Sequence, residues 1–241
     1  MSRVGRGIKI IYMNKNYIDV VYNDINRPLT DYPSKLSSFL YKKYNLKKGD
    51  KFLEVGCGRG EFLKGFIDLG IDGYGVDQTD NAKKICVNSE IKIADLEKEL
   101  LPYDDNFFDI IYSKSVVEHF YYPEKLFKEM HRVLKPGGIL LTLTPDWENT
   151  YKIFYEDYTH RTPFTYNSLK DIQSIVGFTE IKVQKFIQLP ILWENKIYVW
   201  LLKILSFLTN TILVPERLKI FKWVKFSKEI MLLSSSKKKL L

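Results

Sequence analysis

The feature that most constrains this chain is a glycine-rich loop that follows a short apolar segment. Residues 51–55 (KFLEV) are typical of a buried parallel strand, and Gly56, Gly58 and Gly60 alternate directly after it. Glycines at this spacing let the backbone turn tightly and approach a ligand closely, which a Cβ would prevent. Apolar residues at helical spacing follow over 62–69. The segment therefore predicts a strand, a ligand-binding turn and a helix in immediate succession.

The same alternation continues through the central part of the chain. Further strands are predicted at 74–76, 91–93, 108–113 and 139–144, with a weak helix at 79–87 and a stronger one at 123–134. We expect Pro136-Gly137-Gly138 to turn the chain into the strand at 139–144. Alternating strands and helices predict an α/β fold with a mostly parallel, doubly wound sheet covered on both faces. Its ligand crevice lies beyond the carboxyl ends of the strands.

The two ends of the chain extend this core. We expect a helix at 34–45, a helix at 168–176, a sixth strand at 178–188 and a seventh at 229–236. The last two strands are predicted to pair as a hairpin, which gives a Rossmann-like, seven-stranded sheet with an antiparallel last strand. The expected organisation is an N-terminal helical extension (1–50), the core (51–189), an apolar and basic helical insertion (190–224) and a last strand with a basic tail (225–241).

The glycine loop excludes two common nucleotide-binding motifs. A dinucleotide-binding fingerprint needs glycine at its sixth position, where this chain has Glu61. The negative charge of that carboxylate would also repel a pyrophosphate bound at the helix N-terminus. The sequence also contains no GxxxxGK[ST] phosphate loop. Asp77 ends the second strand and can accept hydrogen bonds from both ribose hydroxyls of a nucleoside. Taken alone, Asp77 has a helix cap as its alternative interpretation.

Four segments in this order resemble the successive motifs of class I S-adenosylmethionine-dependent methyltransferases. They are FLEVGCGRGEF, YGVD, FDIIYSKSVVEHF and RVLKPGGILLTLTP, and together they span residues 52–145. The similarity is to the large branch of that family that acts mostly on small molecules and glycans. It implies a Rossmann-like fold, S-adenosylmethionine as cofactor and transfer of its methyl group to an acceptor.

The resemblance also assigns roles to individual residues. In that family the glycine loop cradles the methionine part of the cofactor, an acid in the loop supports its amino group, and acids after the second and third strands hold the ribose and the adenine. A residue near the end of the fourth strand lines the methionine end. The cofactor-binding residues expected here are Glu54, Gly56, Cys57, Gly58, Gly60, Asp77, Gln78, Asp95, Leu96 and Ser113.

Two of the chain's three histidines are candidates for the acceptor side. Methyl transfer to a hydroxyl needs alignment and exclusion of water, and it gains from a base near neutral pKa. His119 follows the fourth strand, and the resemblance places it near cofactor and acceptor. His160 follows the fifth strand in a polar loop, and we predict that it is the general base, oriented by Asp157. The alternative is that Asp157, Thr159 and His160 only brace that loop through bonds to the backbone.

The small number of cysteines argues against disulfide and metal chemistry. Only two cysteines are present, which is too few for a disulfide framework or a cysteine metal cluster. We expect no metal site, with a magnesium site around Asp146 as the weaker alternative. The third histidine, His131, falls in the middle of the helix at 123–134, and we interpret it as structural. The cysteine usage and the polar, basic first residues are typical of a cytoplasmic protein.

The insertion at 190–224 and the distribution of charge along the chain indicate which partners to expect. Residues 197–214 are apolar but interrupted by Lys203, and 217–225 interleave basic and apolar residues. This pattern suits peripheral contact with an anionic membrane through 197–225, or a lid or homodimer face. The net charge of +8 is concentrated at both ends around an acidic middle, which is not the profile of a uniformly basic nucleic-acid binder.

We expect O-methylation of a sugar, glycan or other small molecule. The alternatives are a lipid-linked acceptor such as a quinone, an RNA, or a module that binds the cofactor without turnover.

Overall fold

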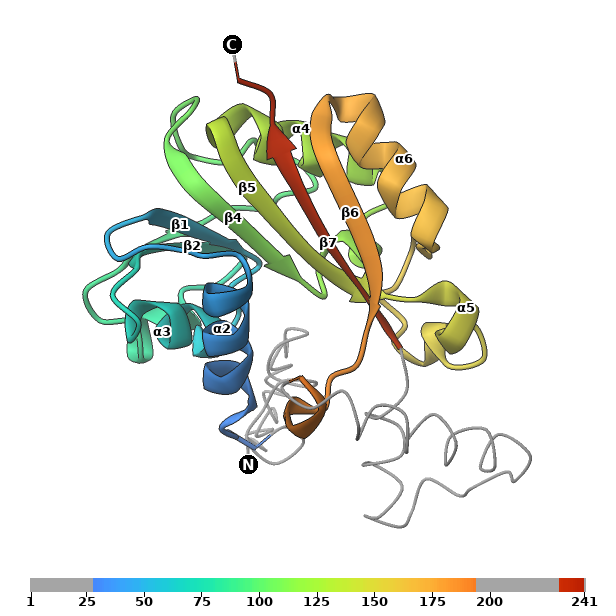
Figure 1. Cartoon of the computed structure of the whole chain (residues 1–241), viewed down its shortest axis with the longest axis horizontal. Helices are drawn as coiled ribbons and strands as arrows, with labels where there is room; N and C mark the ends of the chain where they lie inside the picture. Colours follow the sequence, from blue (N-terminus) through green and yellow to red (C-terminus); the bar gives the residue numbers. More distant parts are fainter. Residues whose placement is uncertain (1–27, 194–229, 241) are drawn as a thin grey trace, which may run out of the picture. The chain divides into compact units, whose positions relative to one another are not determined.

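The computed structural model describes residues 28–193 and 230–240. The chain divides into two units, residues 1–31 and 32–241, and every element discussed below belongs to the second. Figure 1 shows that unit as a twisted sheet with helices packed against it.

The described strands form one seven-stranded sheet in the order β3-β2-β1-β4-β5-β7-β6. Strands β1 to β5 pair in parallel, while β7 lies antiparallel between β5 and β6. This arrangement confirms the predicted α/β, Rossmann-like sheet with an antiparallel last strand. The strands are β1 (Lys51–Val55), β2 (Asp72–Asp77), β3 (Glu90–Ile93), β4 (Phe108–Lys114), β5 (Leu134–Pro145), β6 (Phe178–Phe186) and β7 (Met231–Lys238).

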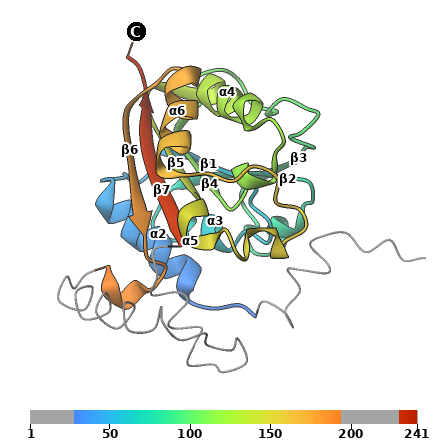
Figure 2. The same ribbon diagram turned by 90° about the vertical axis from the view of Figure 1, so that its right-hand side faces the viewer.

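Helices cover both faces of the sheet, as Figure 2 shows from the side. One apolar cluster joins a sheet face to α4 (Pro123–Val133) and α6 (Tyr166–Val176). A second cluster joins the other face to α2 (Tyr32–Lys43) and α3 (Glu61–Ile67). Each of these helices buries one apolar stripe, which is why the sequence periodicity located them.

Two sequence predictions about local structure were wrong. The weak helix expected at 79–87 is only a single 3₁₀ turn, η1 (Asn81–Lys84). The expected turn at Pro136-Gly137-Gly138 lies inside β5, where the pairing register with β4 shifts between Phe108 and Ile110. Gly137 has a φ of +78°, so the extra residues are absorbed as a bulge and the chain does not reverse.

The predicted insertion is described only at its beginning, where η4 (Pro190–Leu192) forms a short turn. The rest of it, including the candidate membrane, lid or dimer segment 197–225, lies outside the described residues. Within the described ranges, no helix combines the length and the apolar character needed to cross a membrane.

Candidate active site

The glycine loop lies between β1 and α3, at the edge where β1, β2 and β4 end. Gly56, Gly58 and Gly60 all have positive φ angles, of +73°, +51° and +83°. A Cβ on Gly56 would lie 2.3 Å from a methyl carbon of Val116, so that glycine is required by close packing. A Cβ on Gly58 would meet no atom of the described residues within 4 Å, so the backbone there borders open space in this part of the structure. Gly58 is therefore the point at which a ligand can approach the main chain.

Asp77, at the end of β2, holds this loop in place. One carboxylate oxygen accepts a hydrogen bond from Gly58 N at 2.9 Å, and the other accepts one from Thr79 N at 3.2 Å. Burial raises the pKa of Asp77 above its ordinary value, and the backbone donors at Gly58 and Thr79 oppose that shift. An ionised carboxylate has about four lone-pair positions, so Asp77 can still accept ribose hydroxyls.

The residues predicted to hold the nucleoside surround the end of β2. Gln78 is exposed directly after Asp77, and the carbonyl of Asp77 accepts a hydrogen bond from Ala94 N at 3.0 Å. Asp95 and Leu96 follow Ala94 and are half-buried. Asp95 pairs with Lys98 at 2.7 Å, and this hydrogen bond lowers its pKa. An adenine contact by Asp95 therefore has to share the carboxylate with that lysine.

Three other predicted cofactor residues have buried side chains. Glu54 is 3% exposed and its Oε2 has no partner among the described residues, while burial raises its pKa well above the ordinary value. The side chain of Cys57 belongs to the apolar core, so only its backbone faces the loop. Ser113 is fully buried on β4, and its Oγ also lacks a partner within the described part of the chain. Residues after it, notably Val116, pack against the glycine loop.

This arrangement fits S-adenosylmethionine. The open space at Gly58 admits a ligand to the backbone, and the buried Oε2 of Glu54 has no hydrogen-bond donor among the described residues, which the ammonium group of the cofactor would supply. Asp77 provides carboxylate oxygens for ribose at the neighbouring strand end.

A second loop, residues 146–165, lies at the end of β5 and will be called the acceptor loop. Its ends are held together by a bridge between Asp146 and Phe164. Its returning segment is held against η2 (Val117–His119), because Arg161 N and Thr162 N both donate to the carbonyl of Glu118, at 2.8 and 3.0 Å. These two bonds bring the acceptor loop against the residues that follow β4.

His160 is held by the backbone of its own loop. Its Nδ1 lies 2.6 Å from the carbonyl oxygen of Phe154, and its ring packs on that of Phe154 with centroids 4.5 Å apart. A carbonyl can only accept, so the proton resides on Nδ1 and the lone pair on Nε2. The prediction that Asp157 orients the His160 side chain was wrong, because Phe154 fills that role.

Asp157 instead acts on His119 through Thr159. The Thr159 hydroxyl lies 2.6 Å from Asp157 Oδ1 and 2.8 Å from His119 Nδ1. Because the carboxylate takes the single hydroxyl proton, His119 donates from Nδ1 and carries its lone pair on Nε2. Burial, followed by the nearby His160, lowers the pKa of His119 to about 4. The two imidazole rings lie 4.8 Å apart, so the predicted pair of acceptor-side histidines does meet.

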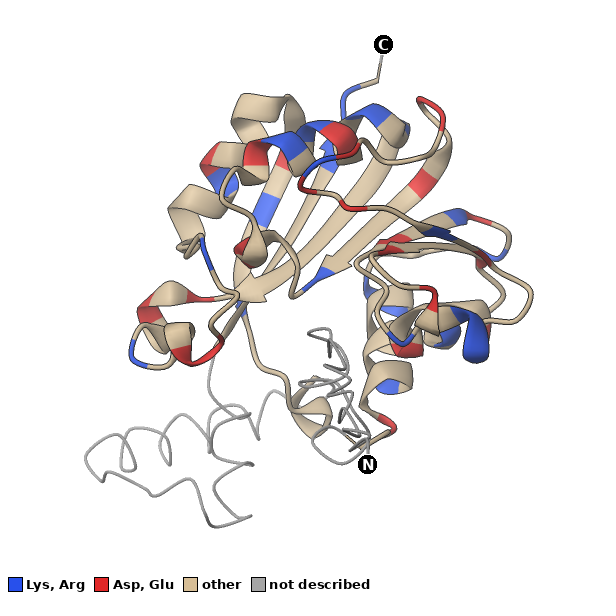
Figure 3. Ribbon diagram, turned by 180° about the vertical axis from the view of Figure 1, so that it is seen from behind, with Lys and Arg blue, Asp and Glu red and all other residues tan. Residues whose placement is uncertain are grey.

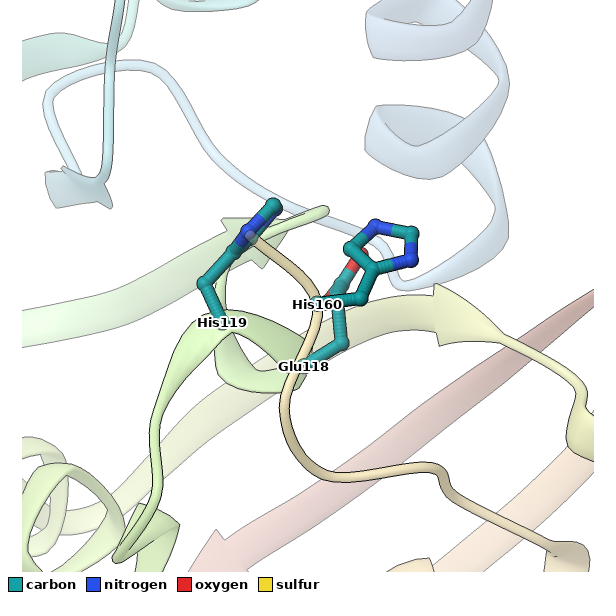
Figure 4. A group of neighbouring side chains, drawn as sticks. All are labelled: Glu118, His119 and His160. Carbon is teal, nitrogen blue, oxygen red and sulfur yellow. The ribbon is translucent and has the colours of Figure 1, made fainter. Parts of the chain in front are cut away.

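Glu118 lies beside both histidines and was absent from the predicted catalytic set (Figure 4). It is fully buried, one oxygen accepts a hydrogen bond from Thr144 Oγ1 at 3.0 Å, and burial raises its pKa to about 7. The sequence signal was the adjacent Glu118-His119 pair, but only the fold shows that the acid side chain points inward. By contrast, His131 packs on Phe178 with centroids 4.9 Å apart, as its structural interpretation expects.

Comparison with known proteins agrees with this geometry. A family described as a methyltransferase domain matches residues 53–142. Ubiquinone/menaquinone biosynthesis C-methyltransferase UbiE of Neisseria gonorrhoeae is 35% identical over 120 residues, which are 45% of this chain and 47% of that protein. Phosphoethanolamine N-methyltransferase 2 of Caenorhabditis elegans is 25% identical over 152 residues, 58% of this chain and 35% of that protein. The chain thus spans half or less of the length of these curated relatives.

Solved structures share the fold. Phosphoethanolamine N-methyltransferase 2 of Haemonchus contortus, in complex with S-adenosyl-L-methionine, superposes with a TM-score of 0.62 at 17% identity, covering 92% of this chain and 59% of that one. A SAM-dependent methyltransferase of Archaeoglobus fulgidus gives 0.62 at 21% identity, covering 90% of this chain and 98% of that one.

Residues 53–142 match a methyltransferase-domain family, and the sheet order is that of the S-adenosylmethionine-dependent methyltransferase fold. The glycine loop and the acid after β2 agree with this match. S-adenosylmethionine is accordingly its cofactor. The class predicted from the sequence is confirmed, whereas the small-molecule and glycan branch stays a prediction.

Replacing Gly58 with alanine tests the cofactor cradle. Gly58→Ala should lower the free energy of unfolding by about 1 kcal/mol, because alanine disfavours positive φ, and should weaken S-adenosylmethionine binding at least tenfold. Gly49→Ala is a matched control, since Gly49 also has a positive φ of +80° and a Cβ added there would lie within 4 Å of no atom in the described ranges. It should lose similar stability, measured by urea unfolding, but no affinity, measured by calorimetry. Equal affinities of the two variants for S-adenosylmethionine would contradict the role of Gly58 in binding the cofactor.

The cofactor affinity should also depend on Asp77 and pH. Protonation removes the carboxylate that accepts the ribose hydroxyls, so affinity should fall as pH decreases through the pKa of Asp77. Because burial raises that pKa above 3.8, the fall begins at a higher pH than for an exposed aspartate. Asp77→Asn should bind at least tenfold more weakly and show no such fall.

The matched control is Asp72→Asn, at the other end of β2. It should leave the pH profile unchanged when binding is measured by fluorescence or calorimetry. A wild-type affinity in Asp77→Asn would remove Asp77 from the cofactor site.

Proposed function

We propose that this chain transfers a methyl group from S-adenosylmethionine to a hydroxyl of a small acceptor, a sugar or glycan in the first place. The observation that carries this proposal is the hydrogen bond from His160 Nδ1 to the Phe154 carbonyl at 2.6 Å. It fixes the tautomer whose Nε2 can take a proton, on a loop that is pinned beside the cofactor edge of the sheet.

The cofactor supplies an electrophilic methyl group on a sulfonium. The glycine loop and Asp77 hold it at the strand ends, while η2 and the acceptor loop hold the acceptor opposite. The Nε2 atom of His160 receives the hydroxyl hydrogen as the acceptor oxygen bonds to the methyl carbon. His119, kept neutral by burial, adds no positive charge that would oppose protonation of His160.

The rim of this site suits a ring-shaped acceptor. Tyrosines are exposed on the two segments that carry the histidines, and their flat, amphipathic rings can stack on a sugar and hydrogen-bond its hydroxyls. They are Tyr121, Tyr122, Tyr151, Tyr155 and Tyr158. Figure 3 shows acidic residues over the region of α5 (Trp147–Thr150) and the acceptor loop. Acidic groups beside the site favour an acceptor without the dense negative charge of RNA.

A quinone-type acceptor is the second candidate. It is supported by the similarity to UbiE, whose name assigns it to ubiquinone and menaquinone biosynthesis. The same tyrosine rim can stack on a quinone ring, so the two acceptors differ in where the methylated product is recovered.

Transfer from methyl-labelled S-adenosylmethionine into an extract of the source cells tests the proposal. The product is sorted into aqueous, lipid and macromolecular fractions, with nuclease digestion of the last. Label in the aqueous or glycan fraction supports the sugar acceptor, and label in the lipid fraction supports the quinone-type one. Nuclease-sensitive label would overturn both.

His160→Ala should lower turnover by about 10²-fold or more, because a positioned general base contributes typically 10²–10⁴-fold. S-adenosylmethionine affinity should stay within about twofold of wild type, since His160 lies outside the cofactor cradle. His131→Gln, at the histidine that packs on Phe178, is the control and should keep wild-type turnover. A loss of less than about fivefold in His160→Ala would remove His160 from the reaction.

A further inference from the structure

Two of the three histidines of the chain converge with a buried carboxylate. Glu118 and His119 come from η2, and His160 comes from the acceptor loop. One potential ligand atom from each of the three lies within 4.8 Å of the other two. Figure 4 shows the two rings and the Glu118 side chain grouped at the ends of the strands.

The carboxylate of Glu118 is incompletely satisfied by the described residues. Its Oε2 accepts from Thr144, whereas Oε1 is buried and meets no hydrogen-bond donor in those parts of the chain. Glu118 is 0% exposed. A buried carboxylate oxygen without a partner costs free energy, so its retention points to a group that binds there.

Both histidines have the outer hydrogen bonds that metal-binding histidines have. His160 Nδ1 donates to the Phe154 carbonyl, and His119 Nδ1 donates to Thr159, which is in turn held by Asp157. Metal-bound imidazoles almost always give their second ring N–H to a carbonyl or a carboxylate-linked partner, which fixes the tautomer and the ring orientation. In His160 this leaves the Nε2 lone pair for coordination.

We propose that Glu118, His119 and His160 bind a divalent first-row transition ion of the zinc type. Two imidazole nitrogens and one carboxylate oxygen form a donor set typical of zinc or iron, whereas magnesium and calcium prefer oxygen ligands. Three protein ligands leave at least one position open for an oxygen ligand. Neighbouring ligand atoms of a tetrahedral ion lie roughly 3.4 Å apart, so a small contraction of the cluster accommodates the ion.

The use of the ion rests on the proposed function, although its binding does not. An ion at this place takes the acceptor hydroxyl as a ligand and lowers its pKa, and the hydroxyl proton leaves to water. His160 then serves as a ligand, because coordination occupies the lone pair that would otherwise accept the proton. The sequence predicted no metal site, because two cysteines are too few for a cysteine metal cluster.

Direct metal binding tests this inference. The full chain, carrying no polyhistidine tag, is treated with a chelator and titrated with Zn²⁺ against a chromophoric competitor, and with Co²⁺ to follow its ligand-field spectrum. We expect one equivalent bound with a Kd below about 1 µM. Glu118→Gln, His119→Ala and His160→Ala should each bind at least 100-fold more weakly.

Controls separate ligation from folding. His131→Gln should bind Zn²⁺ as wild type does, and Thr159→Val should weaken binding by about 10–100-fold, as loss of an outer hydrogen bond does. Each variant is first shown to bind S-adenosylmethionine and to unfold cooperatively. Glu118→Gln is the most informative ligand variant, because glutamine preserves the shape of the buried side chain and the contact with Thr144.

The outcomes distinguish this inference from the proposed function. Stoichiometric binding that the ligand variants abolish supports the site even where no methyl transfer is found, in which case only the proposed function fails. Weak binding, or binding that survives in all three ligand variants, overturns the site. Full methyl transfer by chelator-treated protein with no bound metal overturns the use of the ion and leaves His160 as the base.

Discussion

The hydrogen bond from Gly58 N to Asp77 is the interaction on which the cofactor side of this site depends. It joins the loop after β1 to the end of β2. It also fixes the Gly58 backbone, in its positive-φ conformation, at a place where a ligand can approach it. It also requires β1 and β2 to end at the same edge, which their parallel pairing ensures. The strand order then places the ends of β4 and β5 beside this edge, so both histidine-bearing segments start close to the cofactor cradle.

Burial sets the electrostatics of the acceptor side. It raises the pKa of Glu118 to about 7 and lowers that of His119 to about 4, so the buried environment disfavours charge on both groups. Protein hydrogen bonds determine the tautomers, through Phe154 for one ring and Thr159 for the other. Two imidazoles that present Nε2 lone pairs beside an inward-facing carboxylate can accept a proton or coordinate a metal ion, and both uses require the same geometry.

Much of the fold could be predicted because its signals are local. The glycine loop, the apolar strands and the amphipathic helices each occupy a few consecutive residues, and parallel connectivity orders them. Asp77 could be predicted as well, since a strand end fixes its edge of the sheet. The failures also have physical reasons. Gly137 in β5 absorbs a bulge where proline and glycine suggested a turn, and the segment 79–87 contains too few apolar residues at helical spacing to form more than one turn.

The acceptor side could be predicted only in part. The histidines after the fourth and fifth strands were each predicted to lie on the acceptor side, and the structure brings their rings together. Their partners could not be predicted, since the contact of His160 with the Phe154 carbonyl and the burial of Glu118 depend on how the acceptor loop folds onto η2. Asp157 was the nearest acid in the sequence, yet it acts on the other histidine.

The central claim is that cofactor and acceptor groups meet at one edge of the sheet. A crystal structure of the full chain with S-adenosylhomocysteine tests this most directly. The account predicts ribose hydroxyls on the carboxylate of Asp77, the cofactor chain along Gly58, and the sulfur atom facing the space between His119 and His160. A complex in which the ribose avoids Asp77, or in which the sulfur faces away from both histidines, would contradict it.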